Sequence, residues 1–198
     1  MICKGATACH EAAHAVLSYA LGFGVESVSV GVTIGVRGGR KTYTLRGEYR
    51  GDTARFIRLI PAGEDVAYSP TILAADVVSA AGPAAEQRYY VEQGAPIDTF
   101  GASAGRYDRL DDVARGLPFY GSGKPLAYQR LVWRRAQAAL ENETIWCAVT
   151  CLARELFDLF PETDDLAEHG ETMRGKEAVA IVRAAGVRPG ILGYAVKN

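Results

Sequence analysis

The chain has 198 residues, about the length of one globular domain, with 48% hydrophobic and 23% charged residues. Its formal net charge of −1 excludes a whole-chain field that would attract nucleic acid or an anionic membrane, so we expect no nucleic-acid partner. No apolar run reaches the roughly 18 residues that a membrane span needs, and the N-terminus lacks a basic-then-apolar signal pattern. We therefore expect no membrane span and a cytoplasmic protein.

The N-terminal part predicts one helix followed by a β-hairpin. Residues 2–21 are rich in Ala and Leu and contain no Pro, which indicates a helix that ends at Gly22. Apolar residues at every second position over 28–36 predict a half-buried strand. The turn Gly38-Gly39 leads into a return strand around Tyr43 and Leu45. The segment 47–69 is expected to be a loop with a short element near 55–60.

The remainder predicts helices. Ser69-Pro70 marks the start of one that continues to about residue 93, where Gly82-Pro83 can interrupt it. Further helices are expected to begin at "DRLDDVARGL" and to span about 126–142, 144–160 and 176–185. The predicted fold class is α+β, mainly helical with a small N-terminal sheet. We expect a single domain over 1–198, with a catalytic core over about 1–115 and a C-terminal helical part over about 124–198.

The four cysteines predict no disulfide framework. Cys3 and Cys9 lie on the first predicted helix, and Cys147 and Cys151 are four residues apart on a later one. Neither pair has the two-residue gap of a zinc knuckle or a redox motif. We expect all of them to be reduced and buried as small hydrophobic residues.

The pattern His10-Glu11-Ala12-Ala13-His14 predicts a metal site. Two of the three histidines in the chain are in it. Residues four apart lie on one face of a helix, so His10 and His14 can present two imidazole nitrogens to one zinc ion. Glu11 is rotated away from that face and suits a general base that holds a water molecule. The alternative is that His10 and Glu11 are solvated and His14 is a core histidine. The apolar flanks argue against it, because they leave little room for a polar surface.

Catalytic zinc needs a third protein ligand and an open fourth position. His169 lies far off in the polar stretch "DDLAEHGETM", where a surface residue is expected. The extended metzincin pattern is excluded, because Leu17 and Ala20 stand where it requires Gly and His. The remaining candidates are carboxylates: Glu86, Asp108, Asp111 and Asp112.

The motifs resemble the peptidase domain of the FtsH-type membrane AAA proteases. "HEAAHAVLSYALGFGVESVSV" is similar to that family's "HEAGHA" helix and following strand, and "AGPAAEQ" (81–87) to its "GGRAAEE". "FGASAGRYDRLDDVARGL" resembles its "TGASNDL" region, whose Asp is the third zinc ligand, and "TMRGKEAVAIV" its closing "TLDGEE" helix. The resemblance covers nearly the whole chain in order. It implies Asp108 as the third ligand, preferred to Asp111 and Asp112 in a region that is a few residues longer here.

Ala13 replaces a Gly of the family motif, a change of one methyl group that is expected to alter packing only. The departure that bears on function is that we identify no AAA module or membrane anchor beside the motifs in this sequence. The stretch "GSGKP" (121–125) is no phosphate-binding loop, because Pro118 and Pro125 stand where Gly and Ser or Thr are required.

We therefore expect a zinc-dependent endopeptidase that cleaves unfolded or flexible segments of polypeptide substrates without an ATPase of its own. The sequence leaves open whether the protein forms a homo-oligomer and whether a separate partner delivers substrates to it. The strand over 28–36 is expected to bring its edge beside the zinc and to pair with an extended substrate. Two alternatives remain. One is an inactive pseudo-protease that serves as a binding module. The other is a structural zinc site with a fourth protein ligand such as Cys9 or Glu86.

Overall fold

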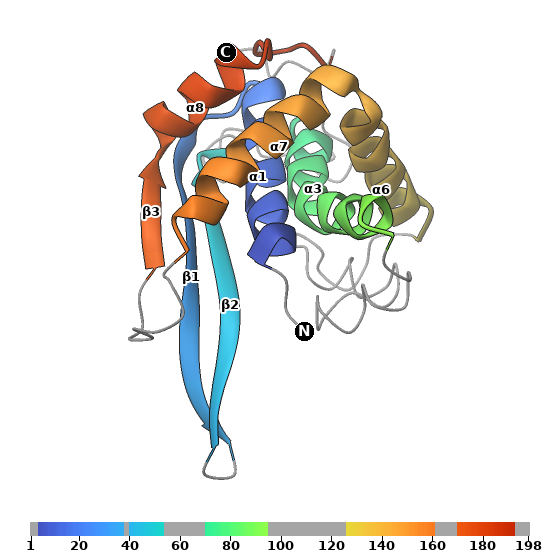
Figure 1. Ribbon diagram of the computed structural model, residues 1–198. Helices are drawn as coiled ribbons and strands as arrows, with labels where there is room; N and C mark the ends of the chain where they lie inside the picture. Colours follow the sequence, from blue (N-terminus) through green and yellow to red (C-terminus); the bar gives the residue numbers. More distant parts are fainter. Residues whose placement is uncertain (1–3, 38–39, 54–69, 95–125, 161–169, 193–198) are drawn as a thin grey trace.

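A computed structural model of the chain describes residues 4–37, 40–53, 70–94, 126–160 and 170–192 (Figure 1). The described elements, in chain order, are α1 (Lys4–Ala20), β1 (Val25–Arg37), β2 (Arg40–Gly51), α3 (Pro70–Glu92), α6 (Leu126–Glu141), α7 (Glu143–Asp158), β3 (Gly170–Arg174) and α8 (Gly175–Ala184). The α+β class, with mostly helices and a small antiparallel sheet, is confirmed. Among these residues no helix is long and apolar enough to cross a membrane.

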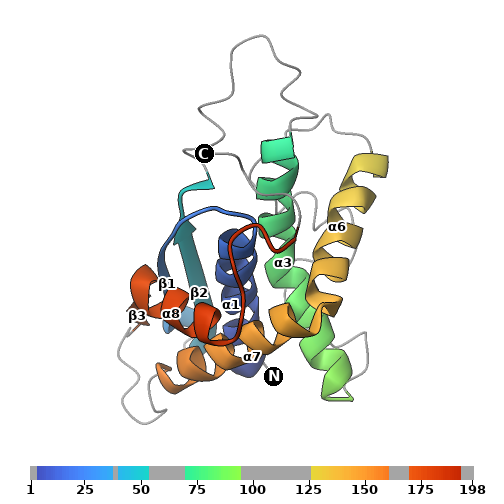
Figure 2. The ribbon, with the colours of Figure 1, turned by 90° about the horizontal axis from the view of Figure 1, so that it is seen from above.

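Helix α1 is the central element of the core. Its side chains are buried on almost every side, which fits a sequence of Ala, Val and Leu with few polar residues. It packs against α3, α7 and the sheet, and Figure 2 shows it enclosed between them. Gly22, with φ of 92°, follows its last turn and directs the chain into β1. The predicted first helix is therefore confirmed over its described residues.

The sheet has the order β2-β1-β3, and both pairings are antiparallel. Val28, Val30 and Val32 alternate along β1 and are buried against the helices. The β1–β2 hairpin extends well beyond the helical body (Figure 1). The hairpin itself was predicted, but the loop expected from residue 47 is wrong, because β2 continues to Gly51. Its pairing with the predicted strand β1 holds that segment extended.

Two features of the sheet differ from the prediction. The stretch expected as polar loop before residue 175 contributes β3, whose pairing with β1 joins the C-terminal part of the chain to the hairpin. Because of this pairing β1 is the central strand. Strand β2 lies beside α1. Among the described residues it pairs with another strand on one side only. The expectation that the edge of the strand over 28–36 borders the site is therefore wrong.

The helices after the hairpin follow the predicted order. Asn142 caps α7 by accepting bonds from the backbone N–H groups of Thr144 and Ile145, at 3.0 and 3.2 Å. Helix α3 continues through Pro83 without interruption, so the break that Gly82-Pro83 allowed is not present. Burial of this stretch between its neighbours outweighs the unfavourable helical propensity of proline. The element expected near 55–60 and the helix expected from "DRLDDVARGL" lie outside the described residues.

The described cysteines are free thiols. Cys9 is buried, as predicted, and Cys151 is partly buried. Cys147 is exposed, so its predicted burial is wrong. Helix α7 is amphipathic, and Cys147 falls on the side away from the buried stripe of Ile145, Val149 and Leu152.

Candidate metal centre

The two imidazoles of the motif lie one helical turn apart on α1. Their ring centroids are 4.9 Å apart and their planes make an angle of 72°. Both rings face α3, which packs along α1. The helix that the motif requires is therefore present, and it brings His10 and His14 together on one face.

The Nδ1 atom of each imidazole lies within hydrogen-bond distance of an acceptor on α3. His14 Nδ1 donates to the backbone carbonyl of Val78 at 2.7 Å. A carbonyl only accepts, so this bond fixes the proton on Nδ1 and leaves Nε2 with its lone pair. His10 Nδ1 lies 3.1 Å from Glu86 Oε2, and this carboxylate can fix the same tautomer. Metal-binding histidines in proteins usually have such a partner on the second ring nitrogen.

The two Nε2 atoms converge on the backbone of Gly82. A Cβ atom at that position would lie 2.4 Å from Nε2 of His14 and 2.5 Å from Nε2 of His10. No side chain can occupy this place while the rings stay where they are. Glycine is therefore required here by the close approach of both rings, and the two Nε2 atoms lie near each other beside the backbone of α3.

Glu11 points to the other side of the site, toward β2. Its side chain is buried, with a residue exposure of 7%, and it lies against Gly47, where any Cβ would overlap its carboxylate. The backbone N–H of Tyr49 donates to this carboxylate. Strand β2 therefore fixes the position of the predicted general base next to His10.

The protonation of Glu11 follows from its burial. Desolvation raises its pKa from 4.5 to about 7, although the neighbouring His10 acts in the opposite direction. The carboxylates of Glu48 and Glu86 raise this pKa further. A carboxylate with a pKa near neutrality is suited to accept and return a proton at physiological pH.

The two histidines have opposite pKa shifts in the metal-free site. Burial, together with the nearby His10, lowers the pKa of His14 to about 3, so His14 is neutral and able to bind a metal. Burial also acts to lower the pKa of His10, but its bond to Glu86 and the charges of Glu11 and Glu86 outweigh burial, and the net shift is upward. A bound cation would replace the proton that these carboxylates favour on His10.

A cavity of about 540 Å³ opens beside the motif. One wall is the edge strand β2 with Glu26 of β1, and the opposite wall is α3. Its lining residues are His10, Glu11, His14, Glu26, Gly47, Glu48, Tyr49, Arg50, Gly51, Thr53, Val78, Ser79 and Pro83. The cavity has the size of a ligand site, and it is bordered by β2, which among the described residues has a pairing partner on one side only.

Tyr49 connects β2 to the metal-binding face. Its ring stacks on His14 with centroids 5.9 Å apart, and its hydroxyl donates to Ser18 Oγ at 2.5 Å. Burial raises the pKa of this phenol, so it remains protonated at neutral pH. Tyr49 thus contacts a face of the His14 ring, whereas Val78 holds the ring at its Nδ1 edge.

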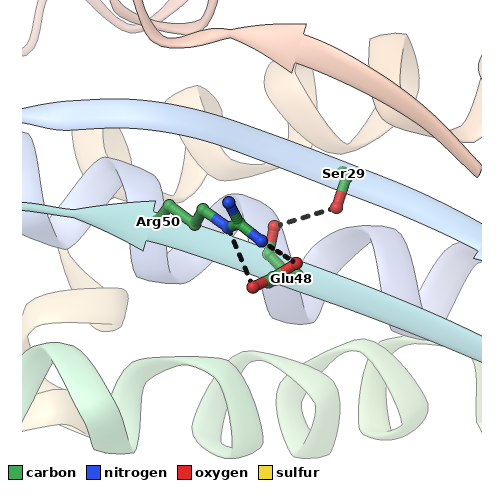
Figure 3. A network of polar contacts seen from close by, with 3 residues as sticks. All are labelled: Ser29, Glu48 and Arg50. Carbon is green, nitrogen blue, oxygen red and sulfur yellow. Dashed lines mark hydrogen bonds and ion pairs between the residues drawn. The ribbon is translucent and has the colours of Figure 1, made fainter.

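Figure 3 shows the charged pair next to this wall on β2. Arg50 donates to both carboxylate oxygens of Glu48, at 2.9 and 3.3 Å, and Ser29 of β1 donates to the backbone carbonyl of Glu48 at 3.4 Å. The pair is largely exposed. It therefore neutralises Glu48 at the rim of the cavity but contributes little to stability.

No third metal-binding side chain joins the two imidazoles within the part of the chain that the structure describes. Asp108, the predicted third ligand, lies outside the described residues, as do Asp111, Asp112 and His169. Glu86, the other candidate, contacts the Nδ1 side of His10 rather than the Nε2 side that faces Gly82. This position suits a residue that orients His10 better than a ligand.

The residues that surround the motif were not predicted from the sequence. Gly82 belongs to the segment "AGPAAEQ", which resembles a family signature. A glycine inside this helical segment was the one available signal of a close approach to another element. Gly47, Tyr49 and the Val78 carbonyl gave no such signal, because their roles depend on how β2 and α3 pack against α1. Comparisons with known proteins add no identification: no protein family, no curated protein and no solved structure matches this chain.

Proposed function

We propose that this protein is a zinc-dependent endopeptidase in which His10 and His14 bind the metal and Glu11 is the general base. The observation that carries the proposal is that two Nε2 atoms, on rings whose Nδ1 atoms each face an acceptor, lie near each other beside Gly82, and that both histidines line the cavity. This donor set fits zinc, which binds neutral imidazole and commonly adds one carboxylate. Asp108 is the proposed source of that carboxylate.

Zinc at this position would polarise the peptide carbonyl and make a water molecule more acidic. Glu11 would accept a proton from the attacking water and return it to the leaving amine. Its burial and its bond from the Tyr49 N–H hold the carboxylate in place for both transfers. The pKa of about 7 in the metal-free site shows how strongly this environment disfavours a permanent charge.

The substrate is proposed to be an extended polypeptide that pairs with β2. The segment Gly47–Gly51 of this strand borders the cavity, and β2 has a pairing partner on one side only among the described residues. Main-chain pairing requires an unfolded segment rather than a particular sequence. We therefore propose cleavage of unfolded or flexible segments without ATP, with a mild preference for apolar side chains near the cut.

The test compares the wild-type protein with Glu11→Gln on casein and on a tightly folded protein. Glutamine keeps the shape of the side chain but cannot accept the proton, so zinc should be retained while casein cleavage falls by roughly a hundredfold or more. The folded protein should resist cleavage, and ATP should change neither rate. Full activity of Glu11→Gln would refute the general-base role, and equal cleavage of both proteins or a dependence on ATP would refute the proposed substrate.

The alternative functions predict other results. A pseudo-protease would bind casein without cutting it, in the presence of one zinc per chain. A structural site would show four protein ligands and no open position in a zinc-loaded structure. The buried carboxylate of Glu11 next to the imidazoles favours the catalytic assignment, because a purely structural site has no use for a base there. Cytoplasmic localisation, self-association and a substrate-delivering partner stay predictions.

A further inference from the structure

Helix α3 contains a proline in its interior, at Pro83, where proline is the least favourable of all residues. The helix continues on both sides of it, and no described peptide bond is cis. Proline has no N–H, so it cannot donate to the carbonyl four residues earlier, which belongs to Ser79. The Ser79 carbonyl therefore lacks the donor that an α-helix normally supplies.

Ser79, which carries this carbonyl, is one of the residues that line the cavity. Pro83 lines it as well, so the stretch of helix between them faces the same space as the imidazoles. The preceding carbonyl, of Val78, accepts the bond from His14. The hydroxyl of Ser79 turns back and donates to the Ala75 carbonyl at 3.1 Å. Two successive residues of the cavity wall thus differ in their carbonyls. The Val78 carbonyl accepts a hydrogen bond from His14, and the Ser79 carbonyl lacks its helical donor.

We propose that Pro83 keeps the Ser79 carbonyl open as an acceptor for a backbone N–H of the bound peptide. This inference rests on the proposed peptidase function. A peptide between β2 and α3 would then pair with the strand on one side and donate to the helix on the other. Every residue except proline carries the required N–H, so the contact recognises polypeptide backbone and no particular side chain. Pro83 is a positioning residue in this arrangement, because it acts through Ser79.

The test uses two substitutions that both restore the N–H. Pro83→Ala and Pro83→Gly should each let residue 83 donate to the Ser79 carbonyl and close the acceptor. Both should lower kcat/KM on a casein-derived peptide about three- to tenfold, the effect of one lost neutral hydrogen bond. In a Glu11→Gln background, where turnover is blocked, both should weaken binding of the fluorescein-labelled peptide by a similar factor. The zinc content should be unchanged.

Stability separates this role from a general packing effect. Alanine is the best helix former, so Pro83→Ala should raise the melting temperature by a few degrees, and Pro83→Gly should melt below Pro83→Ala. Activity should nevertheless fall in both. Val91→Ala is the matched control on the same helix: Val91 is exposed and is not among the residues that line the cavity, so peptide affinity should stay at the wild-type value.

Unchanged peptide affinity and kcat/KM in both Pro83 variants would overturn the inference while zinc-dependent cleavage by the wild-type protein still supported the proposed function. Loss of zinc in the Pro83 variants would also overturn it, because Pro83 would then act through the metal site. If the zinc-loaded wild-type protein neither binds nor cuts the peptide, the proposed function fails and the inference fails with it.

Discussion

The most direct test of the metal site is the substitution Gly82→Ala, which adds one methyl group at the point where the two imidazoles converge. The new Cβ would lie 2.4 Å from Nε2 of His14 and 2.5 Å from both Nε2 and Cδ2 of His10. Favourable contacts between such atoms begin at about 3.5 Å, so the rings have to retreat by about 1 Å. The alternative is that α3 moves away from α1 by a similar distance.

The cost to zinc binding follows from this displacement. Metal–ligand distances tolerate about 0.2 Å, so a shift of about 1 Å removes the geometry for both ligands. Loss of a single orienting partner lowers metal affinity about 10- to 100-fold. We therefore expect Gly82→Ala to weaken zinc by at least about 100-fold, or about 2.8 kcal/mol.

The metal-free fold should change much less. Alanine gains about 1 kcal/mol in helical propensity over glycine, and overpacking costs about 1–3 kcal/mol. The net loss should stay below about 2 kcal/mol, which lowers the melting temperature by less than about 8 °C in a chain of this size.

Zinc affinity is measured by competition with a chromophoric chelator, and folding by circular dichroism. Gly5→Ala is the matched control on α1, because its new Cβ would meet the end of the flexible Tyr89 side chain, which can move aside. That variant should bind zinc as the wild-type protein does. Wild-type zinc affinity in a folded Gly82→Ala variant would refute the placement of the metal between the imidazoles and α3.

Three further predictions concern the residues around the metal. Asp108→Ala should remove zinc from the purified protein, whereas Asp111→Ala and Asp112→Ala should retain it, and metal analysis measures the zinc content of each. If Asp112→Ala is the variant that loses zinc, Asp112 and not Asp108 is the third ligand. Glu86→Gln should weaken zinc about 10- to 100-fold in the same competition assay, because the amide orients His10 less firmly than the carboxylate does; unchanged affinity would argue against the orienting role. In the metal-free protein, burial raises the pKa of Glu11 from 4.5 to about 7, so the folded state holds the proton more tightly than the unfolded state. The corresponding stability is present below pH 4.5 and is lost as the pH rises through 7, by about 3 kcal/mol relative to Glu11→Gln. Urea denaturation of both metal-free proteins from pH 4.5 to 8 measures this difference, and parallel pH profiles would contradict it.

The sequence by itself determined the local elements and the placement of both motif histidines on one face of a helix. The spacing of His10 and His14 needs only a helix beneath it, and the Ala-rich flanks form that helix from local propensity and burial. The alternation along β1 and the start of α3 at Pro70 are local signals of the same kind. These features depend on residues that are at most a few positions apart, so they can be recognised without knowledge of what packs against them.

The tertiary structure decided which groups surround the motif. Glu86, Val78 and Gly82 reach the imidazoles because α3 packs along α1, and the contacts join residues separated by 64 and 76 positions. The pairing of β3 with β1 makes β1 the central strand, and β2 supplies most of the sheet residues that line the cavity. A single sequence holds no periodic trace of such pairings, because they depend on the free energy of the whole packed arrangement and not on any one segment.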